Sequence, residues 1–363
     1  MDDVVVEAAA LCRYDPLAWA RFAFDWSYGE LDGYAGPRAW QAEAFAEIAA
    51  HLKNTETRHM PLMLARASGH GIGKSAFIGM LINWALSTCE DCKVVVTANT
   101  DSQLRTKTAP EVGKWMRLGI TREWFDVSAT CIASRDKANA RTWRADFVPW
   151  SEHNTEAFAG LHNKGKRIVL VFDEASAIAD KVWEVAEGAL TDEETEIIWV
   201  AFGNPTRNTG RFRECFRRYK HRWNHAQIDS RTVEGTNKAQ MAKWAEDYGE
   251  ESDFFKVRVR GMFPSMSARQ FISEADVAAA YGRHVPESAY AFAPKIITVD
   301  PAWEGDDEFV IGFRQGLVFR ILETFAKNDN DLIAAQKIAR YEDEHGADAV
   351  FIDAGFGTGI KSA

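Results

Sequence analysis

The sequence has no apolar stretch close to the roughly 20 residues that a helix needs to span a bilayer, and its first residues, MDDVVVEAAA, lack the basic start of a secretion signal. Its five cysteines include one Cys-x-x-Cys pair, Cys89 and Cys92, but no second pair or nearby histidine completes a zinc set. Internal repeats and low-complexity segments are also absent. We therefore expect a soluble protein with reduced thiols that stays inside the cell and has no membrane partner.

Positive charge is in the minority, because 43 basic residues face 53 acidic ones and the net charge is −10. This balance argues against a simple nucleic-acid coat protein but is compatible with a locally basic channel. The acid is concentrated from Lys295 onward, where seven basic and thirteen acidic residues give −6 and leave −4 for the rest of the chain. At 363 residues the chain is longer than one ordinary domain, and we expect two.

One short segment is rich in glycine. Residues Ser68–Ser75 read SGHGIGKS and lie between an apolar run, Met60–Ala65, and a helix-like run, Ala76–Leu86. Glycines let the backbone N–H groups turn inward around phosphates, and the start of the following helix adds a favourable dipole. The predicted nucleotide-binding residues are Ser68, Gly69, His70, Gly71, Ile72, Gly73, Lys74 and Ser75.

The end of this segment matches the Walker A pattern, although Ser68 replaces the first glycine of that pattern. Lys74 would reach the β and γ phosphates, and Ser75 would offer its hydroxyl to Mg²⁺. An ordinary turn before a helix is the alternative for this octet taken alone.

A second motif favours ATP. Residues Arg167–Ser176 read RIVLVFDEAS, an apolar run that ends in two carboxylates, as a buried parallel strand would. Asp173 fits the Mg²⁺ partner of a Walker B strand. Glu174, which strand alternation would aim differently, fits the base that deprotonates the attacking water. The alternative for this pair alone is a solvated helix start, where acids are common.

The first predicted domain, residues 1–264, alternates between helices and strands after an N-terminal helical extension. We expect helices over Pro37–Leu52 and over Asp101–Met116, the latter capped by Asp101, strands over Lys93–Ala98 and Thr195–Phe202, and a hairpin between Thr130 and Trp150. Such alternation predicts an α/β fold, with a mostly parallel sheet, helices on both faces and a ligand at the carboxyl ends of the strands.

A second pattern follows a linker over residues 265–294. In residues 295–363 we expect strands over Ile296–Val299, Glu308–Arg314, Leu317–Phe325 and Ala349–Ile352, and a helix over Asp331–Glu344. Asp300 and Asp353 each end a strand, so neighbouring strands would bring their carboxylates together. Close carboxylates repel unless a cation lies between them, which suits a Mg²⁺- or Mn²⁺-dependent nuclease, with Asp306, Asp307 and Glu308 adding charge. The alternative is that both aspartates are ordinary loop residues.

The segment Asn208–Arg222 is strongly basic. It carries Arg211, Arg213, Arg217, Arg218, Lys220 and Arg222 against one acid, Glu214. A solvated helix face and a contact with DNA or another subunit remain open for it.

Together these motifs resemble the large terminase subunit of tailed bacteriophages, the motor that packages DNA into a procapsid and cuts the concatemer. The resemblance covers nearly the whole chain from about Pro37. Trp40 and Gln41 match the family's adenine-contacting helix, and Gly203–Thr206 (GNPT) matches its coupling motif. Ala157–His162 (AFAGLH) and Arg260–Pro264 (RGMFP) are similar with less specificity.

The resemblance implies a P-loop NTPase fold followed by a ribonuclease H-like nuclease. Gln41 would then contact adenine, while Asn204 and Thr206 would sense the γ-phosphate. Asp300 and Asp353, the latter in FIDAGFGTG, would be nuclease metal ligands. Implied partners are double-stranded DNA, the small terminase subunit and the procapsid portal, in the host cytoplasm. Members work as rings in which a neighbour supplies an arginine, for which Arg135, Arg141 and Arg144 are candidates or ordinary surface residues.

Two departures from the family matter. His70 stands where many members have an arginine, and Arg66 is no simple substitute; a solvent-facing loop residue is the alternative for His70. The family's third nuclease aspartate lies further along than Ala363, so we expect an incomplete and inactive nuclease. Two rivals to the motor remain, namely a helicase-like ATPase without nuclease activity and a nucleotide-gated assembly module.

Overall fold

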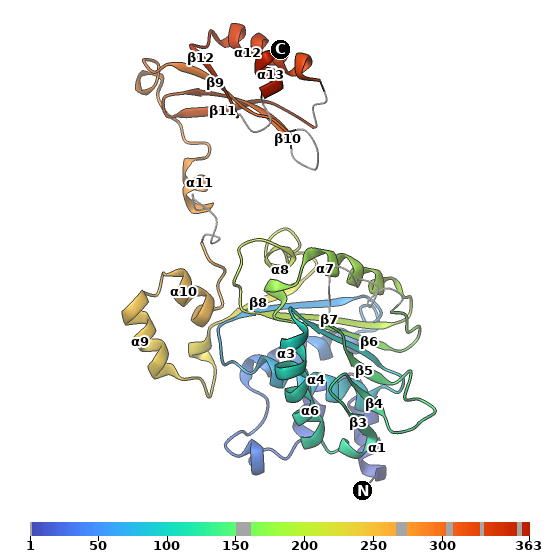
Figure 1. Cartoon of the computed structure of the whole chain (residues 1–363). Helices are drawn as coiled ribbons and strands as arrows, with labels where there is room; N and C mark the ends of the chain where they lie inside the picture. The colour runs from blue at the N-terminus through green and yellow to red at the C-terminus, as the bar shows by residue number, and fades with distance from the viewer. Residues whose placement is uncertain (1, 150–160, 266–273, 303–307, 327–329, 354–357) are drawn as a thin grey trace. The chain divides into compact units, whose positions relative to one another are not determined.

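Two separate sheets organise the chain (Figure 1). The computed structural model describes residues 2–149, 161–265, 274–302, 308–326, 330–353 and 358–363. By its contacts the chain divides into two compact units, Met1–Glu274 and Ala275–Ala363. Within the described ranges, no helix is both long and apolar enough to cross a membrane.

The first unit contains an eight-stranded sheet in the order β3-β4-β5-β2-β6-β7-β1-β8. Its strands are β1 (Leu62–Ser68), β2 (Lys93–Ala98), β3 (Phe125–Val127), β4 (Cys131–Ser134), β5 (Arg144–Phe147), β6 (Arg167–Asp173), β7 (Glu196–Gly203) and β8 (Asn224–Ile228). The strands from β5 to β8 in this order are parallel, whereas β3, β4 and β5 pair antiparallel at one edge. The sheet is therefore mixed, with a parallel centre.

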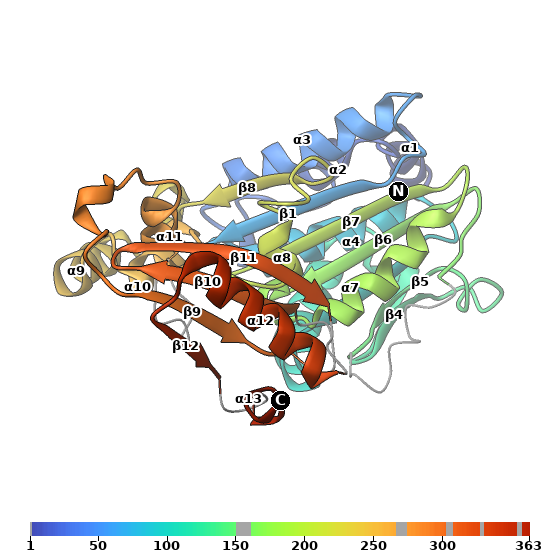
Figure 2. The same ribbon diagram turned by 90° about the horizontal axis from the view of Figure 1, so that it is seen from above.

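The central strands need cover on both faces, because every residue of β1, β6 and β7 is buried. Helices α3, α4 and α6 lie on one face and α7 and α8 on the other (Figure 1), and Figure 2 shows α7 and α8 over the strands from above. The α-helices of this unit are α1 (Asp2–Leu11), α2 (Pro16–Phe22), α3 (Ala39–Lys53), α4 (Lys74–Thr88), α5 (Asp101–Gln103), α6 (Ala109–Leu118), α7 (Asp180–Glu187), α8 (Arg211–Glu214), α9 (Lys238–Tyr248) and α10 (Asp253–Phe255). The two apolar layers meet the same strands from opposite sides.

The second unit is a four-stranded sheet in the order β11-β10-β9-β12, with β12 parallel to β9. Its elements are α11 (Glu274–Ala280), β9 (Lys295–Asp300), β10 (Glu308–Gln315), β11 (Val318–Ala326), α12 (Asp331–His345), β12 (Ala349–Ile352) and α13 (Thr358–Ser362). Ala334 and Ile338 of α12 pack on the buried strand residues Ile297 and Phe309. This small core is separate from those of the first unit.

The predicted elements are largely confirmed. Strands Lys93–Ala98 and Ala349–Ile352 have the expected bounds, and β4 and β5 form the expected antiparallel pair. The basic segment Asn208–Arg222, in contrast, contains only the four-residue helix α8 followed by turns, so a solvated helix face does not describe it.

The helix expected over Asp101–Met116 is wrong in two details. Thr100 rather than Asp101 caps it, because the Thr100 hydroxyl accepts a hydrogen bond from the Gln103 N–H at 3.1 Å while Asp101 pairs with Arg105. A π-helical segment, η2 (Leu104–Thr108), also interrupts it before α6 continues to Leu118. The helical spacing of apolar residues did not reveal this insertion.

Gly261 is a point where the backbone of one segment closely approaches another. It follows the π-helix η8 (Lys256–Arg260) with φ +62°, and a Cβ there would lie 2.7 Å from Ser68 Cα and 2.8 Å from the Ile228 carbonyl oxygen. We expect Gly261→Ala to lower the free energy of unfolding by about 2 kcal/mol more than Gly165→Ala, because overpacking adds to the strain of a positive φ. Gly165 is the matched control, since its φ is +76° and nothing lies within 4 Å of its Cβ position.

Urea unfolding followed by tryptophan fluorescence measures this difference. Trp303 belongs to the second unit and the other twelve of the thirteen tryptophans to the first, so the signal reports mainly on the first unit. Equal midpoints for the two variants would contradict the close approach.

Candidate functional site

The glycine-rich loop lies at the carboxyl end of the sheet. It joins β1, which lies between β7 and β8, to the first turn of α4. Gly71 and Gly73 have φ values of +76° and +85°, which favour glycine, and Gly73 precedes the first residue of α4. Lys74 and Ser75 therefore begin the helix, where backbone N–H groups are available to an anion.

The first half of the loop rests on the chain after β8. The His70 N–H donates to the Arg258 carbonyl at 2.8 Å, and the Gly69 N–H donates to the Ile228 carbonyl at 3.2 Å. The Ser230 hydroxyl donates to the His70 carbonyl at 2.8 Å. A Cβ on Gly69 would meet Ser230 Oγ and the Val259 oxygen at 2.3 Å, so this contact requires glycine.

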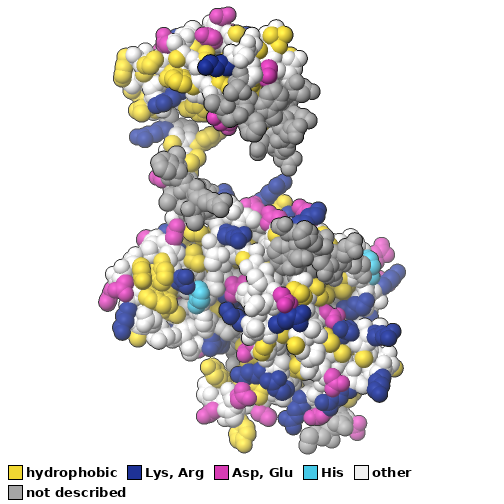
Figure 3. Space-filling model, viewed as in Figure 1, with side chains coloured by type: hydrophobic (Ala, Val, Ile, Leu, Met, Phe, Trp, Pro, Cys, Tyr) yellow, Lys and Arg dark blue, Asp and Glu magenta, His cyan; other side chains and the backbone are white. Residues whose placement is uncertain are grey.

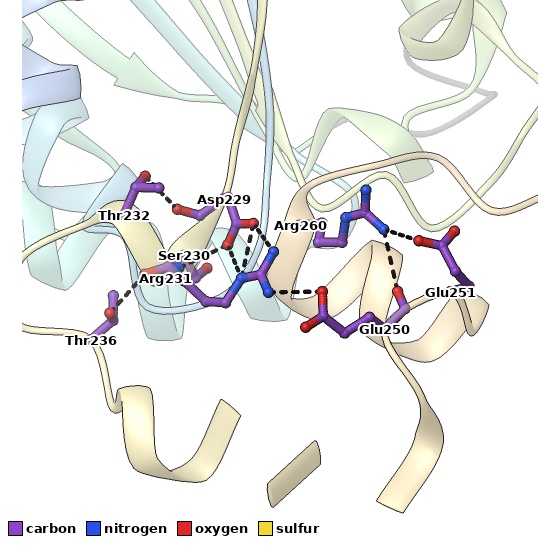
Figure 4. Close-up of polar contacts among 8 residues, drawn as sticks. All are labelled: Asp229, Ser230, Arg231, Thr232, Thr236, Glu250, Glu251 and Arg260. Atoms are coloured by element: carbon purple, nitrogen blue, oxygen red, sulfur yellow. Dashed lines mark hydrogen bonds and ion pairs between the residues drawn. The ribbon is translucent and has the colours of Figure 1, made fainter. Parts of the chain in front are cut away.

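The segment that supports the loop is itself fixed by ion pairs. Figure 4 shows Arg231, next to Ser230, between the carboxylates of Asp229 and Glu250. Arg260 contacts Glu251 in the same view, at 2.7 Å. The first pair joins η7 (Ser230–Thr232) to the turn after α9, and the second joins η8 to the same turn.

The second half of the loop is held by the start of α3. Arg38 Nη1 donates to the Gly71 carbonyl at 2.9 Å, Trp40 Nε1 to the Ile72 carbonyl at 2.9 Å, and Gln41 Nε2 to the Gly73 carbonyl at 2.8 Å. Three successive loop carbonyls are thus turned outward, which leaves the N–H groups of this second half of the loop for the inner side.

Gln41 is the residue predicted to contact adenine. Its Oε1 accepts a hydrogen bond from the Arg38 N–H at 2.9 Å, so both ends of its amide bond to the backbone. It also lines a cavity of about 270 Å³ with Tyr34, Ala76 and Trp115, beside the loop. The structure therefore places Gln41 at the loop, in a position that also supports the loop's shape.

Asp173 ends β6 and is 5% exposed. Its Oδ2 accepts a hydrogen bond from the Thr108 hydroxyl at 2.6 Å, and its Oδ1 accepts one from the Glu174 N–H at 3.0 Å. Burial, followed by the charge of Glu174, raises the pKa of this carboxyl, while the Thr108 hydrogen bond and Lys74 oppose the rise. A cation beside Asp173 would favour its ionised form.

Glu174 leaves the strand differently from the expected alternation. It has φ +52° and ψ +44°, a left-handed conformation that turns the chain at the end of β6 into η5 (Ala175–Ala177). The side chain is one-third exposed, and its Oε1 lies 4.0 Å from Lys74 Nζ. The adjacent acids of this motif thus separate into one buried and one accessible carboxylate.

The residues after β7 complete the site. Asn204 Oδ1 accepts a hydrogen bond from Lys74 Nζ at 3.0 Å, and Asn204 Nδ2 donates to the Ser68 carbonyl at 2.7 Å. Thr206 Oγ1 lies 3.1 Å from the Oγ of Ser176, a residue that follows β6. Since β6, β7 and β1 are neighbours, the structure brings together the predicted residues from three adjacent strand ends.

Three further features named in the sequence analysis are Arg66, His70 and the AFAGLH motif. Arg66 is buried, pairs with Glu47 at 2.6 Å and donates to the Asn224 carbonyl, so it supports β1 and α3 rather than the loop. Burial, followed by the charge of Lys74, lowers the pKa of His70. Part of the AFAGLH motif, residues 157–160, lies outside the described residues.

The candidate arginines for a neighbouring subunit differ in their pairing. Arg135 contacts Glu123 and Asp126, and Arg144 contacts Asp146. Arg141 is exposed in the turn between β4 and β5.

In the second unit, Asp300 ends β9 and Asp353 directly follows the adjacent parallel strand β12. The last ladder pair is Val299 with Ile352, and the Asp353 N–H donates to the Val299 carbonyl at 3.0 Å. Both side chains are exposed and line one cavity of about 470 Å³. Within the described parts of the chain, no group of three or more His, Cys, Asp and Glu side chains is placed to hold a metal, and Asp306 and Asp307 lie outside those parts.

A sequence relative connects these geometries to a known family. The "Probable terminase, large subunit" of Enterobacteria phage P7 is 24% identical over 274 residues, which is 71% of this chain and 50% of the relative. The chain resembles large terminase subunits. It spans about half the length of the curated relative that it matches. No protein-family model matches the chain.

Solved large terminases show a weaker overall likeness. The bacteriophage HK97 large terminase has a TM-score of 0.47 and 10% identity, covering 94% of this chain and 74% of that one. The large terminase of a thermophilic bacteriophage, in complex with ADP, has a TM-score of 0.42 and 11% identity, covering 83% and 74%. The ATPase domain of the Thermus phage P74-26 large terminase has a TM-score of 0.38 and 14% identity, covering 59% and 91%. These scores are too low to match individual site residues.

Thr108 was missed by sequence reasoning, because no motif marks it. We expect Thr108→Val to destabilise the first unit by about 2 kcal/mol near pH 8, since a buried charged hydrogen bond is lost. The loss should be smaller near pH 5. The hydroxyl stabilises the ionised carboxylate, so removing it raises the folded-state pKa of Asp173 further, and a raised acid pKa costs stability as the pH rises.

Urea unfolding at the two pH values, without nucleotide or Mg²⁺, measures this effect. Thr106→Val is the control, because the exposed Thr106 hydroxyl donates only to the Ser102 carbonyl one turn earlier among the contacts of the described residues. A loss for Thr108→Val that does not change with pH would show that its hydroxyl does not stabilise the Asp173 charge.

Proposed function

We propose that this chain is the ATP-hydrolysing motor of a phage large terminase, which moves double-stranded DNA into a procapsid. The observation that carries the proposal is the environment of Lys74, whose ammonium lies 3.0 Å from Asn204 Oδ1 and 4.0 Å from Glu174 Oε1 at the start of α4. The sequence similarity to a large terminase subunit supports the same function.

The loop would hold the phosphates of ATP, in the manner of a P-loop NTPase. Its carbonyls are turned outward to α3 and the chain after β8, and Lys74 would meet the β and γ phosphates. Mg²⁺ bound with ATP would neutralise phosphate charge. Ser75 and Asp173 would hold it, and the fit is good because the buried Asp173 carboxylate meets a hydroxyl and an N–H, and no cationic side chain, among its hydrogen bonds with the described residues.

Hydrolysis would depend on Glu174 and its neighbours. Glu174 is the accessible carboxylate of the pair, so it would orient and deprotonate the attacking water. Asn204 contacts both Lys74 and the loop, so it would respond to loss of the γ-phosphate, and Thr206 would transmit the change through Ser176. Gln41 would contact adenine from the cavity beside the loop.

Glu174→Gln separates nucleotide binding from hydrolysis. We expect this variant to bind ATP with an affinity close to that of the wild type but to hydrolyse it at least about 100-fold more slowly, because a general base is lost. Lys74→Ala should instead weaken ATP binding. Fluorescent-nucleotide titration and single-turnover phosphate release measure the two steps.

Glu184→Gln is the matched control, because Glu184 is a 57% exposed carboxylate on α7 that pairs with Lys181. Its turnover should remain that of the wild type. Rapid hydrolysis by Glu174→Gln would remove Glu174 from its proposed role.

We further propose that the second unit is part of a ribonuclease H-like nuclease whose Asp300 and Asp353 hold Mg²⁺ or Mn²⁺. Two exposed carboxylates at neighbouring strand ends, lining one cavity, are a donor set that suits such a cation, which keeps several water ligands. A bound cation would polarise a phosphodiester and activate water, and the two carboxylates would position it.

Mn²⁺ binding tests these two carboxylates without requiring cleavage. We expect Asp300→Asn and Asp353→Asn each to weaken Mn²⁺ binding to nucleotide-free protein by about tenfold or more. Each variant removes one of the two negative charges of the proposed site in the second unit. Electron paramagnetic resonance titration measures free Mn²⁺, and Asp173→Asn as a common background removes the buried carboxylate that would bind Mn²⁺ at the first site.

Asp343→Asn is the control, because Asp343 is an exposed carboxylate on α12. Equal Mn²⁺ binding by all three variants and their parent would argue that neither strand-end aspartate is a ligand.

The remaining partners follow from the proposed motor. The chain would form a ring at the procapsid portal in the host cytoplasm and receive DNA with the small terminase subunit. Arg141, which is exposed, would be the first candidate for an arginine that enters a neighbour's site, ahead of the paired Arg135 and Arg144.

A further inference from the structure

The segment from Arg207 to Arg222 has the opposite charge to the chain. It contains seven basic residues and one acid, a formal charge of +6 in a chain of −10. On the face that Figure 3 shows, Lys and Arg side chains of the first unit are otherwise interspersed with acidic ones. A sequence-local excess of this size favours a locally positive potential.

Part of this charge is used to position the rest. Glu187, at the end of α7, pairs with both Arg211 and Arg222. The Tyr219 ring lies close to three guanidinium groups, with Arg211 at 4.5 Å, Arg218 at 5.3 Å and Arg222 at 5.8 Å from its centroid. These contacts restrict the arginines before any partner binds, which lowers the entropic cost of binding.

Three cations of this segment line a hollow. Its volume is about 630 Å³, and its described lining residues, called here the basic hollow, are Glu214, Phe216, Arg217, Arg218 and Lys220. Arg217, Arg218 and Lys220 are exposed. Guanidinium and ammonium groups so close together suit the oxygens of successive phosphates.

The hollow is connected to the nucleotide site through a short stretch of chain. Thr206, which contacts Ser176, is followed by Gly210 and by α8, whose first N–H donates to Asp180 Oδ1 at 2.8 Å. A shift of Asn204 or Thr206 would therefore reach the hollow through few intervening residues.

We propose that the basic hollow binds the phosphate backbone of double-stranded DNA. This inference rests on the proposed motor function and names a surface through which the first unit would grip DNA. A motor needs contacts that do not depend on base sequence, and phosphate contacts meet that need. An acidic protein partner fits less well, because protein interfaces have an apolar core and Phe216 is the one apolar residue among the described lining.

Salt dependence of DNA binding tests the inference on the whole chain. We expect the triple variant Arg217→Ala, Arg218→Ala, Lys220→Ala to bind a labelled mixed-sequence duplex at least about tenfold more weakly, and the slope of log K against log[KCl] to fall in magnitude by about two to three, since each phosphate contact contributes about 0.9. The charge-preserving variant Arg217→Lys, Arg218→Lys, Lys220→Arg should keep most of the slope.

A second triple variant controls for net charge. Lys53→Ala, Arg122→Ala and Lys181→Ala remove three cations whose side chains are 56%, 64% and 66% exposed and scattered over the first unit, and should leave binding within about twofold of the wild type. The variant Arg217→Ala, Arg218→Ala, Lys220→Ala is called here the hollow variant. Unchanged basal ATP hydrolysis and an unchanged unfolding midpoint would show that the hollow variant is folded.

The outcomes separate this inference from the proposed function. If the wild type binds duplex with a steep salt slope and the hollow variant does the same, the inference is wrong while the motor function stands. If the wild type binds no duplex even at low salt, the motor function proposed for this chain fails as well. If the triple variant Arg217→Ala, Arg218→Ala, Lys220→Ala keeps its DNA binding but loses the binding of polyglutamate that the wild type shows, the inference is overturned in favour of an acidic protein partner.

Discussion

Backbone hydrogen bonds hold the loop Ser68–Ser75 from two sides. On one side, side chains from the start of α3 donate hydrogen bonds to the carbonyls of Gly71 and Gly73. On the other side, the His70 N–H donates to the Arg258 carbonyl and the His70 carbonyl accepts from the Ser230 hydroxyl. The loop can therefore keep an open shape without a ligand inside it. Such preorganisation means that binding does not have to order the loop first. The rest of the site depends on this, because Lys74 and Ser75 take their positions from the loop.

The two ends of strand β6 each carry a buried ionisable side chain, but the partners of these side chains differ. At its amino end Arg167 is fully buried, bonds to Glu196 at 2.7 Å and lies 4.0 Å over the Trp84 ring, so the buried charge is fully paired. At its carboxyl end Asp173 is also buried, yet its oxygens meet a hydroxyl and an N–H. The first arrangement needs no further partner. The second keeps a carboxylate whose charge a cation would stabilise further, which is the difference expected between a structural and a binding position.

The local parts of the site could be predicted from the sequence. Lys74, Asp173 and Asn204 follow strands, and neighbouring parallel strands end at the same edge, so their meeting follows from strand order and motif. Contacts that come from distant segments could not be predicted. Thr108 meets Asp173 across 65 residues from within a π-helical insertion, and Ser230 meets His70 across 160, with no spacing that marks either.

Conformation also limited what the pattern could predict. The sequence suggested strand alternation for Asp173 and Glu174, but Glu174 turns the chain with a positive φ, which a non-glycine residue adopts only when its surroundings require it. The eight-stranded order with an antiparallel edge likewise depends on which strands pair, and alternation of helices and strands sets only the parallel centre.

The end of β7 joins the loop Ser68–Ser75 to the rest of the first unit. Gly203 lies so close to the chain after β6 that a Cβ would be 3.1 Å from the Ala175 nitrogen, so the two strand ends are closely packed. Asn204 adds a side-chain link from this point to both Lys74 and Ser68. A change at the γ-phosphate position would alter the contacts of Lys74 and Glu174 first, and Asn204 would follow because one amide bonds to both the lysine and the loop. The chain from Thr206 to α8 would then move as the continuation of β7, since tightly packed elements shift between discrete positions rather than deform.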